Sequence, residues 1–423
     1  MVTFGSQEAL HTAVGEVAQA GYGLRLAGVE AQSCLLEAMA TQLEAAQNEI
    51  LEANTLDLEA SLEMAVPDLV LDWLKLTPER IHIASKMLRR LALLGDPRWL
   101  NALPTNRWAK ATTGYSQVVP LGVVAFVYEA FPELAAIIAG FCIRTGNGLI
   151  LKGGNEASQT NQAIVEALHR ALDNQDIPTA TLLSLADDSG DAVRSWLLQD
   201  PGVNLVLPYG RPSLVKQVMR QAAVPVLPTA MGNCYLYWAA SGFTATVAHL
   251  VIDSHRGEPD AVNALEKVLI HPGCSAAAVA QLCRTLWDHG FTVLGDEAIQ
   301  QEMPDLALAS PNDWHQPFLA KRVILGRVDN LAAAADWMNR HSSGHANVLV
   351  SDTYSETVQF PRLVNSAVVY INTSPRFVRN PSQAAAMALG MTTQQGRCQG
   401  FVGLNALLTT QHILQGFDGR GKS

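Results

Sequence analysis

Two cysteines, Cys234 and Cys274, are the side chains best suited to nucleophilic chemistry in this sequence. A thiolate attacks carbonyl carbon and is also a fair leaving group, so a cysteine beside a base could support acyl transfer. Cys274 follows an apolar run that ends at His271, a position that suggests the end of a strand. Neither cysteine has an evident activating base, and we therefore expect both to be buried, inert thiols.

Histidines offer a second kind of chemistry. His249 with Asp253, and His341 with His345, are each spaced to share one helix face, as metal ligands often are. No supporting Cys or Glu cluster accompanies either pair, so surface or capping histidines are the simpler interpretation and no metal site is predicted. The six cysteines lie far apart without a CxxC pair, which excludes a zinc ribbon and favours reduced thiols.

Bulk composition narrows the class of protein. The chain has 423 residues, 48% hydrophobic and 16% charged, which indicates a packed globular protein of two or three domains. A net charge of −10 without runs of Lys or Arg disfavours nucleic acid and membrane surfaces as partners. The N-terminus does not resemble a signal peptide, and no apolar window approaches the roughly 18 residues of a membrane span. We expect a soluble cytoplasmic protein.

The elements that position these side chains begin with helices. Apolar residues recur at helical spacing through the first hundred residues, and Thr77-Pro78-Glu79 is a helix start. Further along, apolar runs predict strands that alternate with helices. The strands are expected near Val118 to Val127, Leu149 to Leu151, Thr181 to Ala186 and Val203 to Leu207, with helices at Leu134 to Arg144 and Gln159 to Asp173. This alternation predicts a parallel sheet covered on both faces.

A second alternating block runs from about Tyr235 to Met391. It predicts strands at Lys267 to His271, Val323 to Leu325, Ala346 to Val350 and Ser366 to Asn372. Two further strands are expected at Ala109 to Val119 and Asn405 to Ile413. The fold class is therefore α/β, with two lobes and a small strand element.

Several stretches resemble the γ-glutamyl phosphate reductase family of the aldehyde dehydrogenase superfamily, from about residue 30 to the end. They are ILEANTLDLEA with LTPERI, VVPLGVVAFVYEAFPE running into RTGNGLILKGGNEASQTN, VPVLPTAMGNCYLYW with PDAVNALEKVLIH, SAVVYINTSPRF, and ALGMTT with GFVGLNAL. The resemblance implies a proline-biosynthesis reductase with an aldehyde dehydrogenase fold. Its chemistry would be attack of a thiolate on an acyl phosphate, followed by hydride delivery from NADPH to the thioester.

The position of the family's catalytic cysteine holds Val262. The family stretch reads approximately K-T-Q-R-P-x-V-C-N-A, and residues 255–264 here read HRGEPDAVNA, with Asn263 and the flanking residues keeping the register. The resemblance therefore implies a site without its nucleophile. The family arginine before the proline is replaced by Glu258, a carboxylate that would not favour an anionic phosphate.

Other reacting positions also depart from the family. In Y-E-A-R-P-N the asparagine resembles the superfamily's oxyanion donor, and Glu133 stands there in this chain. A carboxylate would repel an oxyanion where an amide would stabilise it. E-T-G-V-G-N-C-H becomes residues 228–235, PTAMGNCY, which keeps Cys234 but loses a glutamate and a histidine. The Gly-rich D-G-G-E-F-G and the late H-A-R-G-P become residues 379–384, RNPSQA, and 397–401, RCQGF.

The cofactor-binding stretch is better retained. Lys152, Gly153, Gly154 and Glu156 end a strand and open a helix, and the resemblance places Lys152 near the adenosine ribose of NADP(H). Gly210 falls in P-Y-G-R, where the family has P-R-G-G close to the pyrophosphate. Arg211 replaces the second glycine, which restricts backbone approach to a phosphate.

The resemblance implies three parts. Residues 1–105 and 122–233 form a nucleotide-binding, Rossmann-like lobe; residues 234–399 form a second, catalytic-type lobe; and residues 106–121 with 400–423 form an oligomerisation element. Strands in that element would otherwise be open edges, so we expect a homo-oligomer, with a dimer as the first expectation.

Two functions follow from these observations. One is a catalytically silent member of the reductase family that acts by binding or assembly, with an active reductase subunit or glutamate 5-kinase as a partner. The other is an active NADPH-dependent reductase, converting γ-glutamyl phosphate to glutamate 5-semialdehyde, whose chemistry uses another group. The coordinated losses at Val262, Glu133 and Glu258 favour the first.

Overall fold

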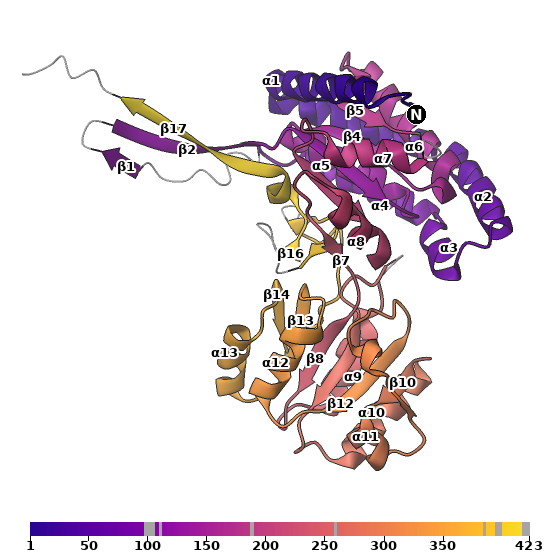
Figure 1. The fold of residues 1–423 in the computed structure, drawn as a ribbon, viewed down its shortest axis with the longest axis vertical. Coiled ribbons are helices and arrows are strands. Elements are labelled where there is room, and N and C mark those ends of the chain that lie inside the picture. The colour runs from indigo at the N-terminus through magenta and orange to yellow at the C-terminus, as the bar shows by residue number, and fades with distance from the viewer. Residues whose placement is uncertain are drawn as a thin grey trace, which may run out of the picture. The chain divides into compact units, whose positions relative to one another are not determined.

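The computed structural model describes residues 1–96, 106–109, 112–186, 190–257, 260–383, 386–393 and 400–416 (Figure 1). The chain forms two compact units. Unit 1 comprises Met1–Pro228, Asn380–Leu389 and Gly403–Ser423, and unit 2 comprises Thr229–Arg379 and Gly390–Val402. The predicted three-part division by role, with boundaries at 105, 121, 233 and 399, stays a prediction.

Unit 1 begins with helices, as the apolar spacing predicts. They are α1 (Gln7–Ala45), α2 (Gln47–Glu63), α3 (Asp68–Leu74) and α4 (Pro78–Ala92). The helix start at Thr77 is confirmed, because its side chain accepts a hydrogen bond from the Arg80 amide and Pro78 lies in the first turn. Within α1, Gly28 has a φ of 86°, so the helix is kinked there.

A parallel sheet in the order β5-β4-β3-β6 forms the centre of unit 1. Its strands are β3 (Val123–Tyr128), β4 (Gly148–Lys152), β5 (Leu182–Ser184) and β6 (Leu205–Tyr209). The connecting elements are α5 (Glu133–Thr145), η1 (Asn155–Ala157), α6 (Ser158–Asp173), η2 (Thr179–Thr181), α7 (Gly190–Gln199) and α8 (Pro212–Gln221). All residues of β3, β4 and β6 are buried, as expected for apolar strands covered on both faces.

The chain changes direction across this sheet at β3. From β3 it steps to β4 and then β5, and afterwards it returns to the other side of β3 as β6. The carboxyl ends of β3 and β6 are therefore neighbours, with Tyr128 paired to Tyr209. Such a reversal of strand order is where open α/β sheets bind ligands.

A second sheet of unit 1 is antiparallel, in the order β1-β2-β17. Its strands are β1 (Asn106–Ala109), β2 (Thr112–Pro120) and β17 (Leu408–Gly416), and Figure 1 shows β2 and β17 side by side. Pairing runs from Leu408 against Pro120 to Gly416 against Thr112. The predicted strand from Asn405 begins late, because Leu404–Leu407 form the 3-10 helix η6.

Unit 2 contains a seven-stranded parallel sheet in the order β11-β10-β12-β9-β8-β13-β14. Its strands are β8 (Cys234–Trp238), β9 (Leu265–Ile270), β10 (Thr292–Gly295), β11 (Ala307–Leu308), β12 (Arg322–Arg327), β13 (Ala346–Val350) and β14 (Val368–Ile371). The connecting helices are α9 (Thr244–Ser254), α10 (Ala276–Asp288), α11 (Glu297–Glu302), η4 (Pro311–Trp314), α12 (Leu331–His341) and α13 (Tyr354–Leu363). A small antiparallel sheet joins β7 (Thr229–Ala230), β15 (Met391–Thr392) and β16 (Gly400–Phe401).

Apolar side chains pack on both faces of the seven-stranded sheet of unit 2. Along β8, Leu236 and Trp238 belong to one core cluster, whereas Tyr235 and Tyr237 belong to another. Alternate residues of a strand point to opposite faces, so one strand supplies both cores. The predicted α/β class with parallel-rich sheets is confirmed.

Candidate functional site

Val262 lies in unit 2, in the loop that leads into β9, and its side chain is buried. Its backbone carbonyl accepts hydrogen bonds from the Gly232 amide at 2.8 Å and from Nε2 of His345 at 2.9 Å. The loop is thus held through its main chain. Valine itself provides no nucleophile.

Asn263 is buried beside Val262 and holds a different segment. Its Nδ2 donates to the Pro375 carbonyl at 2.7 Å and lies 3.4 Å from the Tyr370 hydroxyl. No donor among the described residues reaches its Oδ1. The amide group therefore fixes the chain after β14, while its acceptor oxygen is left without a hydrogen bond.

Cys234 has a neighbour that its sequence context does not reveal. Its Sγ lies 3.2 Å from Nε2 of His345, and both side chains are fully buried. The expectation that Cys234 has no nearby base is therefore wrong. His345 also does not share a helix face with His341, because α12 ends at His341 and His345 precedes β13.

The hydrogen bonds of His345 nevertheless prevent it from acting as that base. A carbonyl can only accept, so Nε2 must carry a proton and donate it to Val262. Nδ1 lies 2.8 Å from Oγ of Ser343, and that hydroxyl also reaches the carbonyls of Gly232 at 3.0 Å and Asn233 at 3.2 Å. Burial lowers the pKa of His345 to about 4, so the ring is neutral with this proton arrangement at neutral pH.

The thiols of Cys234 and Cys274 are consequently poor nucleophiles. Burial raises the pKa of the Cys234 thiol well above its ordinary value, with a further contribution from Glu266. Burial also raises the pKa of Cys274, whose Sγ donates to the Ala239 carbonyl at 3.5 Å. A thiol that stays protonated is a poor nucleophile.

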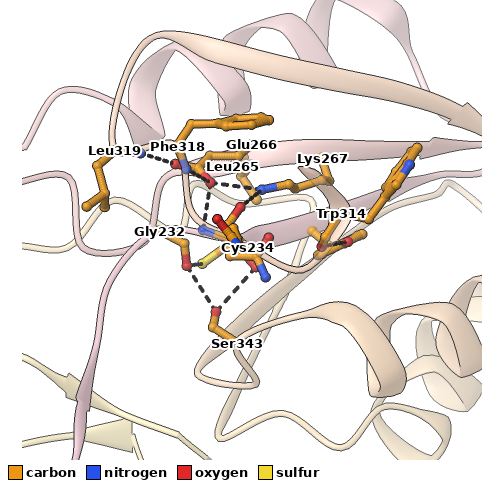
Figure 2. A network of polar contacts seen from close by, with 12 residues as sticks. Gly232, Cys234, Leu265, Glu266, Lys267, Trp314, Phe318, Leu319 and Ser343 are labelled. Carbon is orange, nitrogen blue, oxygen red and sulfur yellow. Dashed lines mark hydrogen bonds and ion pairs between the residues drawn. The ribbon is translucent and has the colours of Figure 1, made fainter. Parts of the chain in front are cut away.

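A buried ion pair, Glu266–Lys267, lies inside β9, directly after the loop that contains Val262 (Figure 2). The Glu266 carboxylate accepts the amides of Asn233, Phe318 and Leu319, each at 2.9 Å, and the Lys267 ammonium at 3.0 Å. Lys267 also donates to the Gln316 carbonyl at 2.7 Å. Burial lowers the pKa of Lys267, although the neighbouring Glu266 opposes that change. The pair fastens two loops to the strand.

A second ion pair holds the loop that contains Val262, at Asp260. Nη2 of Arg379 lies 2.7 Å from Oδ2 of Asp260, and the Asp260 side chain is buried. Ser374 donates to Asp253 at 2.7 Å, so the segment after β14 is attached to the end of α9 as well. Glu258, predicted to oppose a phosphate, lies outside the described residues, as do Ala384 and residues 394–399.

In unit 1, Glu133 is the first residue of α5 and is buried against Arg80 of α4. Arg80 donates from Nε to Oε1 at 3.1 Å and from Nη2 to Oε2 at 2.5 Å. Arg80 further donates to the Trp73 carbonyl at 2.9 Å. The carboxylate is therefore a fixed structural partner and offers no donor to an oxyanion.

The predicted cofactor residues follow the carboxyl ends of unit 1 strands. Lys152 ends β4, and its Nζ donates to the Gly153 carbonyl at 3.0 Å. Glu156, in η1, accepts the Ala130 amide at 2.8 Å, and a side chain at Gly154 would clash with it. Gly210 follows β6 with a φ of 144°, a value suited to glycine. The structure thus brings Lys152, Glu156 and Gly210 to one edge of the sheet.

The sequence identified the candidate site residues but not the side chains that contact them. His345, Arg80 and Arg379 each contact a site residue that lies more than fifty residues away in sequence. No local spacing encodes such pairings. Among the residues described, no three His, Cys, Asp or Glu side chains gather as metal ligands would, and no helix is long and apolar enough to span a bilayer.

The chain is similar to known proteins along most of its length. Residues 1–232 match the aldehyde dehydrogenase family. "Gamma-glutamyl phosphate reductase 2" of Synechocystis sp. is 44% identical over 380 residues, covering 90% of each chain. The crystal structure of γ-glutamyl phosphate reductase from Thermotoga maritima superposes with a TM-score of 0.88 at 26% identity, covering 97% of this chain and 99% of that one.

A more distant structure shares the fold and contains a dinucleotide. NADP-dependent glyceraldehyde-3-phosphate dehydrogenase from Bacillus halodurans, solved with NADP, gives a TM-score of 0.70 at 16% identity, covering 97% of this chain and 92% of that one. That protein thus has the same fold and is complexed with NADP. With the reductase relatives matching nearly end to end, this chain belongs to the γ-glutamyl phosphate reductase family, within the aldehyde dehydrogenases.

Proposed function

We propose that this chain is a catalytically inactive member of its proline-biosynthesis family and acts by binding or assembly. The observation that supports the proposal most is Val262, a residue without a nucleophile at the position where the family resemblance places the cysteine. The valine stands in a loop held by Gly232 and His345. A thioester intermediate needs a thiolate at that position.

The surroundings of Val262 and Glu133 agree with this proposal. His345 is committed as a donor to the Val262 carbonyl and cannot accept a proton there. Glu133 is bound to Arg80 by two hydrogen bonds. An acyl-transfer site would need a base for its nucleophile and donors for its oxyanion, and neither residue provides one.

The alternative is an active NADPH-dependent reductase that converts γ-glutamyl phosphate to glutamate 5-semialdehyde with another nucleophile. Cys234, beside His345, is the residue that would favour it. Its burial and raised pKa weigh against that role.

Assembly is proposed through the antiparallel sheet of unit 1. β17 forms an edge of that sheet, and an edge of nine residues is a ready surface for pairing. We propose a homo-oligomer, with a dimer first, and an active reductase subunit or glutamate 5-kinase as a further partner. The proposed location is the cytoplasm. NADP(H) is the dinucleotide class proposed for the β3–β4–β6 edge, with Lys152 nearest a 2′-phosphate.

Thiol reactivity distinguishes the two functions. In a Cys398→Ser variant at pH 8, we expect iodoacetamide to modify exposed Cys34 and to leave Cys234 and Cys274 unmodified while the chain is folded. The measurement is mass spectrometry of the labelled peptides, with urea-unfolded chain as the control in which all thiols react. Rapid labelling of Cys234 or Cys274, slowed by glutamate semialdehyde with NADP⁺, would instead support the alternative.

A further inference from the structure

The point between β3 and β6 in unit 1 is where a dinucleotide phosphate would be received. In open α/β sheets, phosphates bind outside the carboxyl ends of strands, at a reversal of strand order, on backbone amides and a helix N-terminus. Here the Glu129 amide donates to the Tyr209 carbonyl at 3.1 Å, and α8 begins directly after Arg211. The first residue of α8 is Pro212, which has no amide hydrogen to offer.

A side chain of the protein already lies at this point. The Glu129 carboxylate accepts the backbone amide of Arg211 through a short contact. It also accepts Nε of Arg211 at 3.1 Å and Nη2 at 2.9 Å. The carboxylate thus binds the amide and the cation that a phosphate would otherwise use.

Glutamate side chains also take up the space and a second backbone amide at the carboxyl ends of these strands. The Glu129 side chain packs so closely on Gly210 that a Cβ at Gly210 would clash with it. A second carboxylate, Glu156, takes the Ala130 amide at 2.8 Å. Glu156 thus takes a second backbone amide at this edge that an anionic ligand could otherwise use.

We propose that Glu129, held by Arg211, occupies the anion position between β3 and β6, so that this chain binds NADPH weakly while that carboxylate is present. An anionic dinucleotide phosphate does not fit beside the paired carboxylate. The family stretch P-R-G-G has a glycine at the position of Arg211, so the pair is a feature of this chain's own residues. This inference takes its ligand, NADP(H), from the proposed function. The Glu129–Arg211 pair then gives a reason why NADPH would bind weakly.

The test is titration of NADPH, followed by its fluorescence, into the native full chain and three variants. Glu129→Gln removes the charge at nearly constant size, and Arg211→Gly removes the cation that holds it. Glu166→Gln is the matched control, since Glu166 is an exposed carboxylate of α6 in the same unit. Circular dichroism checks that each variant is folded.

We expect Glu129→Gln to bind NADPH at least about tenfold more tightly than the native chain, because the amide and guanidinium of Arg211 are then available to a phosphate. Arg211→Gly should bind no more tightly than the native chain, since the Glu129 carboxylate is then left without its counter-charge, and Glu166→Gln should bind as the native chain does. Native binding as tight as in Glu129→Gln would overturn the proposal, as would failure of Glu129→Gln to bind, or a gain in Arg211→Gly equal to that in Glu129→Gln. Binding is measured without turnover, so failure here leaves the inactivity of the chain untouched.

Discussion

Replacing Glu266 with alanine is expected to lower the free energy of unfolding of unit 2 by about 3–5 kcal/mol. The variant would leave the Lys267 ammonium buried without its counter-charge, because both side chains are fully inaccessible to solvent. It would also leave the amides of Asn233, Phe318 and Leu319 without their acceptor (Figure 2). Unpaired buried charges and donors are among the costliest defects in a folded protein.

Urea unfolding, followed by circular dichroism and tryptophan fluorescence, measures this change. Glu297→Ala, at an exposed carboxylate of the same unit, is the control and should change stability by less than about 1 kcal/mol. A double variant, Glu266→Gln with Lys267→Met, should lose less than Glu266→Ala because no charge remains buried. Glu266→Ala with the stability of the native chain would show that the ion pair does not support the loops.

Restoring the cysteine alone is expected not to restore catalysis. Val262→Cys should leave turnover at least about a thousandfold below that of an active family reductase, since a missing oxyanion donor alone costs about 10²–10³. The new thiol would be buried where Val262 is, and burial keeps a thiol protonated. His345 would still donate to the carbonyl of residue 262, and Glu133 would still be paired with Arg80.

The measurement is reductase turnover of purified Val262→Cys beside Val262→Ala, which has a similar core change and no thiol. Thiol titration of the unfolded variant confirms the added cysteine. Turnover at the rate of an active relative from this single change would contradict the account of Glu133 and His345.

Much of the fold was predictable because its strands are apolar and its helices periodic. VVAFVY and LILK are buried on both faces of a parallel sheet, and such strands have a signature in composition alone. Boundaries were harder. The strand predicted from Lys267 begins at Leu265, because Glu266 and Lys267 satisfy one another and can lie inside the sheet. A sequence shows the two charges but not the three amides from residues 233, 318 and 319 that complete the site.

The candidate site was likewise predictable only in part. Val262 was identifiable because neighbouring residues keep the family register, which is a property of the chain read in order. Its surroundings were not, because His345 follows it by 83 residues and meets it only in the folded structure. The replacement of the cysteine by Val262 can thus be read from the sequence. The hydrogen bonds around Val262 depend on tertiary packing and cannot.

Turnover of the native chain in the reverse direction decides whether this protein is catalytically inactive. Purified protein would be incubated with NADP⁺, glutamate semialdehyde and phosphate, and NADPH formation followed by absorbance, with an active family reductase as the positive control. We expect a rate equal to that of a denatured blank while circular dichroism shows a folded chain. A rate well above the blank, lost when a single residue of this chain is replaced, would identify a nucleophile and contradict the proposal that the protein is inactive.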